Sequence, residues 1–95
     1  MKSAHFSREA QRDILEASRW MVARAFQKVM KQAATTLGEY PLAGMERPDL
    51  VNPPFRFFVI TGFPYVIVYN PTMTPPLILR VFHGARDLPE LLEGL

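Results

Sequence analysis

The residues best suited to chemistry lie near the C-terminal end of the chain, in the run Leu77–Pro89. Arg80, His83, Arg86 and Asp87 place two guanidinium groups, an imidazole and a carboxylate within eight consecutive residues. Histidine exchanges a proton near neutral pH, and arginine donates charge and hydrogen bonds. Such a set can act either as catalytic groups or as donors in a binding surface.

A strand is the element that must hold these groups. Residues 77–83 are apolar and rich in β-branched and aromatic side chains, which favours a strand with one charge, Arg80, in its middle. Gly84 permits a sharp change of direction, and Asp87 can cap a short C-terminal helix with Pro89 in its first turn. We expect this helix to pack back on the sheet through three leucines at helical spacing, Leu88, Leu91 and Leu92.

Arg56 is a second isolated charge, in a strand predicted over residues 55–61. Because burying a lone guanidinium is costly, Arg56 and Arg80 should each reach solvent, a carboxylate or a ligand. Both could equally be outward-facing strand residues, and a backbone group could equally satisfy His83. Metal-ligand spacing, a Gly-rich phosphate loop and a serine nucleophile elbow are all absent from the sequence, so neither a metal nor a cofactor is implied.

The N-terminal half is predicted to be helical, because residues 8–37 contain neither Gly nor Pro. Ser7 can cap this region and Gly38 can end it. Apolar residues recur at three- and four-residue steps: Ala10, Ile14, Ala17, Met21, Ala25, Val29, Ala33 and Leu37. Since residues 19–23 hold no turn former, we expect one helix of about 45 Å, and a hairpin turning at Trp20 is the alternative.

A single long helix would have a structural consequence for the N-terminal strand, expected over residues 2–6. That strand could not return to its own sheet, so it would stay loose or pair with a second chain in a dimer. The apolar stripe is also broader than the core of a small domain needs. We therefore expect part of it to be exposed and to bind another chain. The candidate docking residues are Trp20, Met21, Phe26 and Met30.

The C-terminal half is predicted to be a sheet. Residues 65–69 and 77–83 read as further strands, and the short turns between consecutive strands favour an antiparallel meander. Residues 40–54 contain four prolines and are expected to be irregular. The fold class is therefore α+β: an N-terminal helical region packed on a small antiparallel β-sheet, followed by a short C-terminal helix.

Composition limits the classes of protein to which the chain can belong. A length of 95 residues predicts one domain, and 48% apolar residues exclude a disordered chain. The absence of cysteine, of a secretory signal and of a long apolar run favours the cytoplasm. The net charge is only +2, but residues 2–31 hold seven Lys or Arg against three acidic residues, which suggests an acidic protein partner or nucleic acid.

The string Leu79–Leu92, LRVFHGARDLPELL, resembles the C-terminal signature of ParE-type toxins, the toxin halves of bacterial toxin–antitoxin pairs in the RelE/ParE superfamily. Five further pieces resemble the family in the right order: Phe6–Ala10 with Arg12–Ile14, Tyr40–Gly44, Arg47–Leu50, Arg56–Val59 and Tyr65–Tyr69. The resemblance covers nearly the whole chain and implies one toxin domain over residues 1–95. It also implies that residues 2–6 form an edge strand.

The resemblance implies one of two activities. RelE-type members cut mRNA on the ribosome, whereas ParE-type members bind and poison DNA gyrase, a type II topoisomerase. After Asp87 the chain has no Tyr, His or Lys to complete a nuclease site, and its lysines are confined to positions 2, 28 and 31. We therefore interpret the chain as a non-enzymatic toxin that causes growth arrest, with a toxic surface of Arg56, Arg80, His83 and Arg86.

The resemblance further implies a cognate ParD-like antitoxin, which would lie along the helical region and a sheet edge. The chain itself is expected to form a homodimer or a toxin–antitoxin hetero-oligomer. Two alternatives stay open. One is an mRNA interferase with Arg56, Arg80 and His83 as its catalytic cluster. The other is an inactive relative that only binds an antitoxin.

Overall fold

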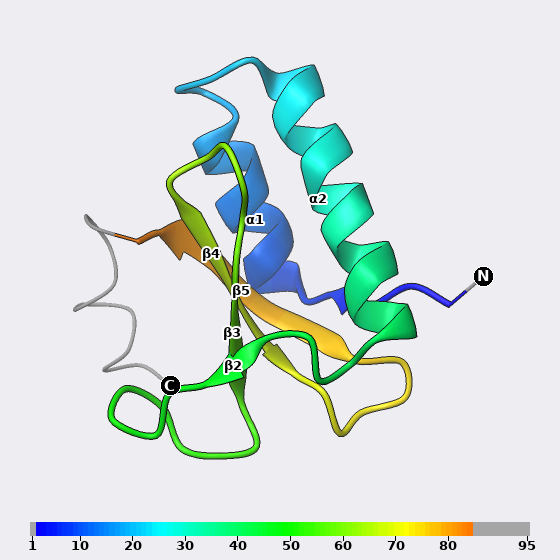
Figure 1. The fold of residues 1–95 in the computed structure, drawn as a ribbon. Coiled ribbons are helices and arrows are strands. Elements are labelled where there is room, and N and C mark those ends of the chain that lie inside the picture. Colours follow the sequence, from blue (N-terminus) through cyan, green and yellow to red (C-terminus); the bar gives the residue numbers. More distant parts are fainter. Residues whose placement is uncertain (1, 85–95) are drawn as a thin grey trace.

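Two helices cover one face of a five-stranded sheet in the computed structural model, which describes residues 2–84 (Figure 1). The helices are α1 (Arg8–Ala17) and α2 (Ala23–Glu39), and the sheet order is β1-β5-β4-β3-β2. The strands are β1 (His5–Phe6), β2 (Met45–Glu46), β3 (Arg56–Val59), β4 (Tyr65–Asn70) and β5 (Leu77–His83). The α+β class is confirmed. The predicted C-terminal helix lies outside the described residues.

The predicted antiparallel meander is confirmed for β3, β4 and β5, which pair in that order. The sheet as a whole is mixed, because β1 runs parallel to β5 at its edge, and the prediction of an antiparallel sheet is wrong in this respect. A strand that precedes both helices reaches β5 only after a long crossover, the kind of connection that parallel pairing requires. The short strand β2 lies in the region predicted to be irregular and was missed.

The prediction of one long helix over residues 8–37 is wrong, and the alternative hairpin is confirmed. Ser18 ends α1: its Oγ donates to the carbonyl of Ile14 at 2.7 Å, and the next turn closes as Trp20 N–H donates to the carbonyl of Ala17 at 3.0 Å. Serine competes in this way with regular helical bonding. Val22 then precedes α2 in an extended conformation.

Burial explains why the hairpin forms although the turn contains no Gly or Pro. The apolar stripe changes phase at the turn: Ala25, predicted to face the core, is exposed, and Phe26 is fully buried in its place. Folding back lets both helices contribute to one core between helices and sheet, and it returns β1 to its own sheet. That core includes Ala10, Ala17, Phe26, Leu37, Ile67 and Ile78. A second cluster on the other face includes Val51, Phe57, Val68 and Phe82.

Gly38 has a packing role in place of the predicted role of ending the helix. The helix α2 continues to Glu39, and a Cβ added at Gly38 would lie 2.5 Å from the carbonyl oxygen of Lys2. The N-terminal segment crosses α2 at this point, where Ala4 N–H donates to the carbonyl of Ala34 at 2.8 Å. Glycine is therefore required because two stretches of backbone approach closely.

Neither helix within residues 2–84 is long and apolar enough to cross a membrane.

Tyr69 ties the segment after α2 to the centre of the sheet. Its hydroxyl accepts a hydrogen bond from Gly44 N–H at 2.8 Å and donates one to the carbonyl of Pro41 at 2.7 Å. Burial raises the pKa of Tyr69, and the Gly44 N–H and the nearby Arg56 oppose that shift. The hydroxyl therefore stays protonated and serves as both donor and acceptor.

We expect Tyr69→Phe to lower the free energy of unfolding by about 1–3 kcal/mol, because two backbone groups lose their partner. Thermal denaturation should show a fall of several degrees in the melting temperature. Tyr40→Phe is the matched control, since Tyr40 is exposed and should leave the melting temperature unchanged. Equal melting temperatures for the two variants would show that the Tyr69 hydroxyl does not hold this segment.

Candidate functional site

The outer edge of β5 is closed by the N-terminal part of the chain. The strand β1 covers only Leu77 and Ile78. Ser7 continues from there: its N–H donates to the carbonyl of Ile78 at 2.9 Å, and its Oγ donates to the carbonyl of Leu79 at 2.8 Å. The same Oγ accepts from Ala10 N–H at 3.0 Å, so the predicted cap of α1 is confirmed and also joins the helix to the strand.

Asp13 completes this edge and holds Arg80. Its carboxylate accepts from Arg80 Nε at 2.8 Å, from Arg80 Nη2 at 2.9 Å and from Val81 N–H at 2.9 Å. The Arg80 and Asp13 side chains are only 25% and 15% exposed. Paired, bidentate contacts between arginine and carboxylate are among the stronger protein hydrogen bonds. Arg80 is expected to reach solvent, a carboxylate or a ligand, and it reaches the carboxylate of Asp13.

Arg56 also has a carboxylate partner, and this pair lies toward the opposite edge of the sheet, at β3 and β2. Its Nη1 donates to the carbonyl of Gly44 at 2.8 Å, and its Nη2 donates to Glu46 Oε1 at 3.0 Å. Arg56 therefore fastens β2 to β3, next to the Tyr69 hydroxyl that binds the same glycine. This arginine is part of the packing of the segment after α2.

The structure separates Arg56 from His83. Within the sheet, Arg56 lies opposite Tyr69 and His83 lies opposite Tyr65, so the two are four residues apart along β4 and on different neighbouring strands. At ~3.3 Å per residue their backbones are about 13 Å apart along the strand direction alone. Arg80 lies between them, opposite Val68. Arg86 lies outside the described residues.

His83 packs against an aromatic ring at the end of β5. Its imidazole and the ring of Tyr65 lie 5.5 Å apart, centroid to centroid, at 76° to one another. The ring of Phe26 also packs here, with its centroid 5.2 Å from that of Tyr65 and 5.5 Å from that of Phe63. Among residues 2–84, no group of three or more His, Asp or Glu side chains could hold a metal ion.

The four candidate docking residues divide into two pairs. Trp20 is 70% exposed, and Met21 is partly buried against the core. Phe26 and Met30 are 0% and 2% exposed, so the prediction that they form an exposed face is wrong. The hairpin turns these two side chains toward the sheet. In the helical region, the exposed large apolar side chains lie instead around the α1–α2 turn, at Leu15, Trp20 and Val22.

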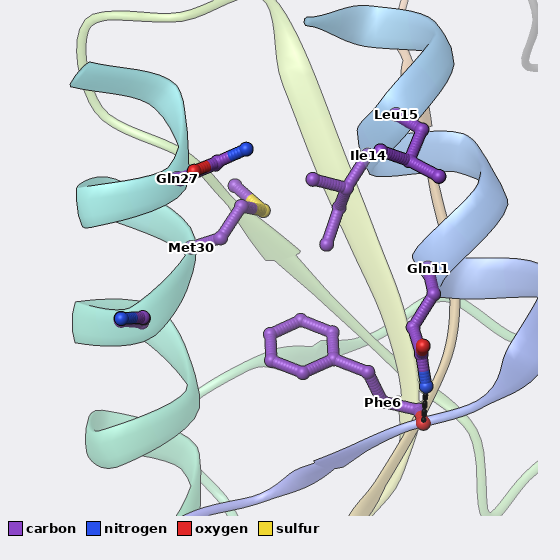
Figure 2. A pocket seen from close by; sticks show the side chains of 7 residues that line it. Phe6, Gln11, Ile14, Leu15, Gln27 and Met30 are labelled. Atoms are coloured by element: carbon purple, nitrogen blue, oxygen red, sulfur yellow. Dashed lines mark hydrogen bonds between the residues drawn. The ribbon is translucent and has the colours of Figure 1, made fainter. Parts of the chain in front are cut away.

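Two pockets adjoin this apolar surface. One, of about 300 Å³, lies between the helices, where Phe6, Ile14 and Met30 point into the space between α1 and α2 (Figure 2). It is lined by Phe6, Gln11, Ile14, Leu15, Gln27, Met30 and Lys31. The other, of about 360 Å³, is lined by Trp20, Met21, Phe63, Pro64, Tyr65 and His83. It brings a residue of the predicted toxic surface, His83, beside two of the predicted docking residues.

Asp13 is the functional candidate that sequence reasoning missed. It lies at three- and four-residue spacing from Ala10 and Ala17, both of which are buried, so it belongs to the inward face of α1. A carboxylate within an apolar helical face needs a buried partner, and Arg80 was already identified as a charge that needed one. Pairing the two would have predicted the contact between α1 and β5. Glu46, the partner of Arg56, carried no comparable signal.

Comparisons with known proteins agree with this fold. A family profile described as ParE toxin of type II toxin-antitoxin system, parDE, matches residues 4–88. Among solved structures, the chain is similar to one from "Chromosomal ParDE TA system from P. aeruginosa", with a TM-score of 0.68 and 23% sequence identity. That match covers 87% of this chain and 96% of the other. At this identity it shows a shared fold. No curated protein matches the chain.

We expect the two aromatic residues Phe26 and Trp20 to differ in their effect on stability. Phe26→Ala removes a fully buried ring and should lower the free energy of unfolding by about 3–5 kcal/mol. Trp20→Ala removes an exposed ring and should change it by less than about 0.5 kcal/mol. Chemical denaturation of both variants tests this assignment. A large loss of stability in Trp20→Ala would place Trp20 in the core.

Proposed function

Because the chain belongs to the family of ParE toxins of type II toxin–antitoxin systems, we propose that it is a toxin that binds DNA gyrase, a type II topoisomerase, and arrests bacterial growth. A cognate ParD-like antitoxin neutralises it in the cytoplasm. The observation that carries this proposal is the family match over residues 4–88, which spans both helices and all five strands.

The arrangement of the charged residues supports binding rather than RNA cleavage. General acid–base catalysis requires the reacting groups within hydrogen-bond reach of one substrate. Arg56 and His83 lie at opposite ends of β4 by their register, and Arg56 is engaged with Gly44 and Glu46. This separation and these contacts disfavour a catalytic cluster that contains both residues. The proposed toxic surface therefore follows β5 at the edge of the sheet, with Arg80 and His83 on alternate faces of this strand, and it continues to Arg86 in sequence.

The antitoxin is proposed to dock along the helical hairpin. The groove between α1 and α2 is mainly apolar, and the exposed apolar residues at the α1–α2 turn lie beside it. The exposed face of α2 carries three basic residues, Arg24, Lys28 and Lys31. An amphipathic helix with an acidic polar face is complementary to this surface.

An extended segment of the antitoxin can add to the sheet at β3. The strand β2 pairs only with Arg56 and Phe57, so it stops short of the exposed Val59. The outer edge of β5 is closed by β1, Ser7 and Asp13. Strand addition is therefore favoured at β3.

One preparation of the purified protein, assayed in two ways, separates the candidate functions. We expect inhibition of gyrase supercoiling, together with intact mRNA in a translation reaction that is analysed by primer extension. Cleaved mRNA would instead support the mRNA interferase. Antitoxin binding without either activity would support an inactive relative.

We expect Arg80→Ala to weaken inhibition of gyrase supercoiling at least tenfold, because it removes the central donor of the proposed toxic surface. The dissociation constant for the antitoxin, measured by calorimetry, should stay within about threefold. Arg47→Ala is the matched control, since Arg47 is a loop arginine paired with Asp49 in an exposed ion pair. If Arg80→Ala loses antitoxin affinity and inhibition in parallel, the role of this residue is structural.

A further inference from the structure

We propose that Asp13 is a positioning residue, which fixes the guanidinium of Arg80 in the orientation needed to contact the target. The inference rests on the proposed function, binding to gyrase through the end of β5. It concerns a residue on α1, 67 positions away in sequence, that makes no part of the predicted toxic surface.

The contact geometry fixes both members of the pair. Asp13 Oδ2 accepts from Arg80 Nε and from Val81 N–H, and Oδ1 accepts from Arg80 Nη2. The backbone bond holds the carboxylate against β5, and the two guanidinium bonds hold the plane of the arginine fork. An arginine restrained at two nitrogens cannot rotate about its last side-chain bonds without breaking both contacts.

The rest of α1 holds Asp13 in place. Ser7 joins the start of the helix to Ile78 and Leu79 through its N–H and its hydroxyl. Ala10 and Ala17, on the same face as Asp13, are 0% and 2% exposed. The helix therefore cannot turn about its axis without exposing this face, and the carboxylate has one position relative to β5.

The restraint of Arg80 matters for binding because an unrestrained arginine side chain has many rotamers. A flexible side chain loses conformational freedom when a partner immobilises it, and that loss weakens binding. Arg80 is held before the partner arrives, and a quarter of its side chain is still exposed. Asp13 thus supplies the preorganisation, while Arg80 makes the contact.

A double-mutant cycle with Asp13→Asn and Arg80→Ala tests the inference in the full-length chain. Asparagine keeps the size of the side chain but replaces one acceptor by a donor, which cannot pair with the guanidinium. We expect Asp13→Asn to weaken inhibition of supercoiling about tenfold, or about 1.4 kcal/mol. Antitoxin affinity should stay within twofold. In the Arg80→Ala background, Asp13→Asn should cause no further loss of inhibition.

Two further variants separate positioning from stability. Glu16→Gln neutralises an exposed carboxylate on the same helix and should leave inhibition unchanged. Arg80→Lys keeps the charge but loses the fork, so it should reduce inhibition about as much as Asp13→Asn. This variant also keeps the inference testable if Asp13→Asn folds poorly.

The possible failures are distinct. Wild-type protein that leaves supercoiling unaffected overturns the proposed function and this inference with it. Wild-type protein that inhibits, together with Asp13→Asn or Arg80→Lys that inhibits equally well, overturns only the positioning role. The positioning role is also overturned if Asp13→Asn reduces inhibition equally in the presence and in the absence of Arg80. A loss of antitoxin affinity that parallels the loss of inhibition overturns it as well.

Discussion

The attachment of α1 to the outer edge of β5 is the interaction on which the rest of the described structure depends. Ser7 and Asp13 continue the edge where the two-residue strand β1 ends, and they satisfy backbone groups of Ile78, Leu79 and Val81. An open edge would invite pairing with another chain. Here side chains from a helix close it, and the contact with Asp13 also sets the orientation of Arg80.

That attachment also accounts for the hairpin. With α1 held along β5, the apolar residues of α2 reach the sheet only if the chain reverses between the helices, which happens at residues 18–22. The reversal uses the Ser18 hydroxyl and one short turn, without Gly or Pro. Local preferences favoured continuing the helix, and burial of Phe26 and Met30 outweighed them. Tertiary packing, rather than local preference, therefore determines the turn between α1 and α2.

This balance explains which parts the sequence could predict. The strands β4 and β5, the Ser7 cap and the α+β class follow from local patterns, and the structure confirms them. The turn at Trp20, the strand β2 and the parallel pairing of β1 depend on contacts between distant residues. For the candidate site, the need of Arg56 and Arg80 for partners was predictable, because an isolated charge in an apolar strand is costly. The identity of those partners, Glu46 and Asp13, became visible only in the fold.

In the proposed function, the toxin presents a restrained arginine, Arg80, to a protein target, and His83 lies three residues further along β5 on the alternate face of the strand. The surface around Trp20 borders the pocket that His83 also lines, so an antitoxin docked over the helical hairpin would lie close to the toxic surface. Binding of target and antitoxin would then be mutually exclusive.

Titration of the purified chain into gyrase holoenzyme, monitored by calorimetry, tests directly whether the chain binds this target. We expect saturable binding that disappears when the toxin is first mixed with its antitoxin. An absence of binding at micromolar concentrations, by a protein that still arrests growth when expressed, would show that gyrase is not the target.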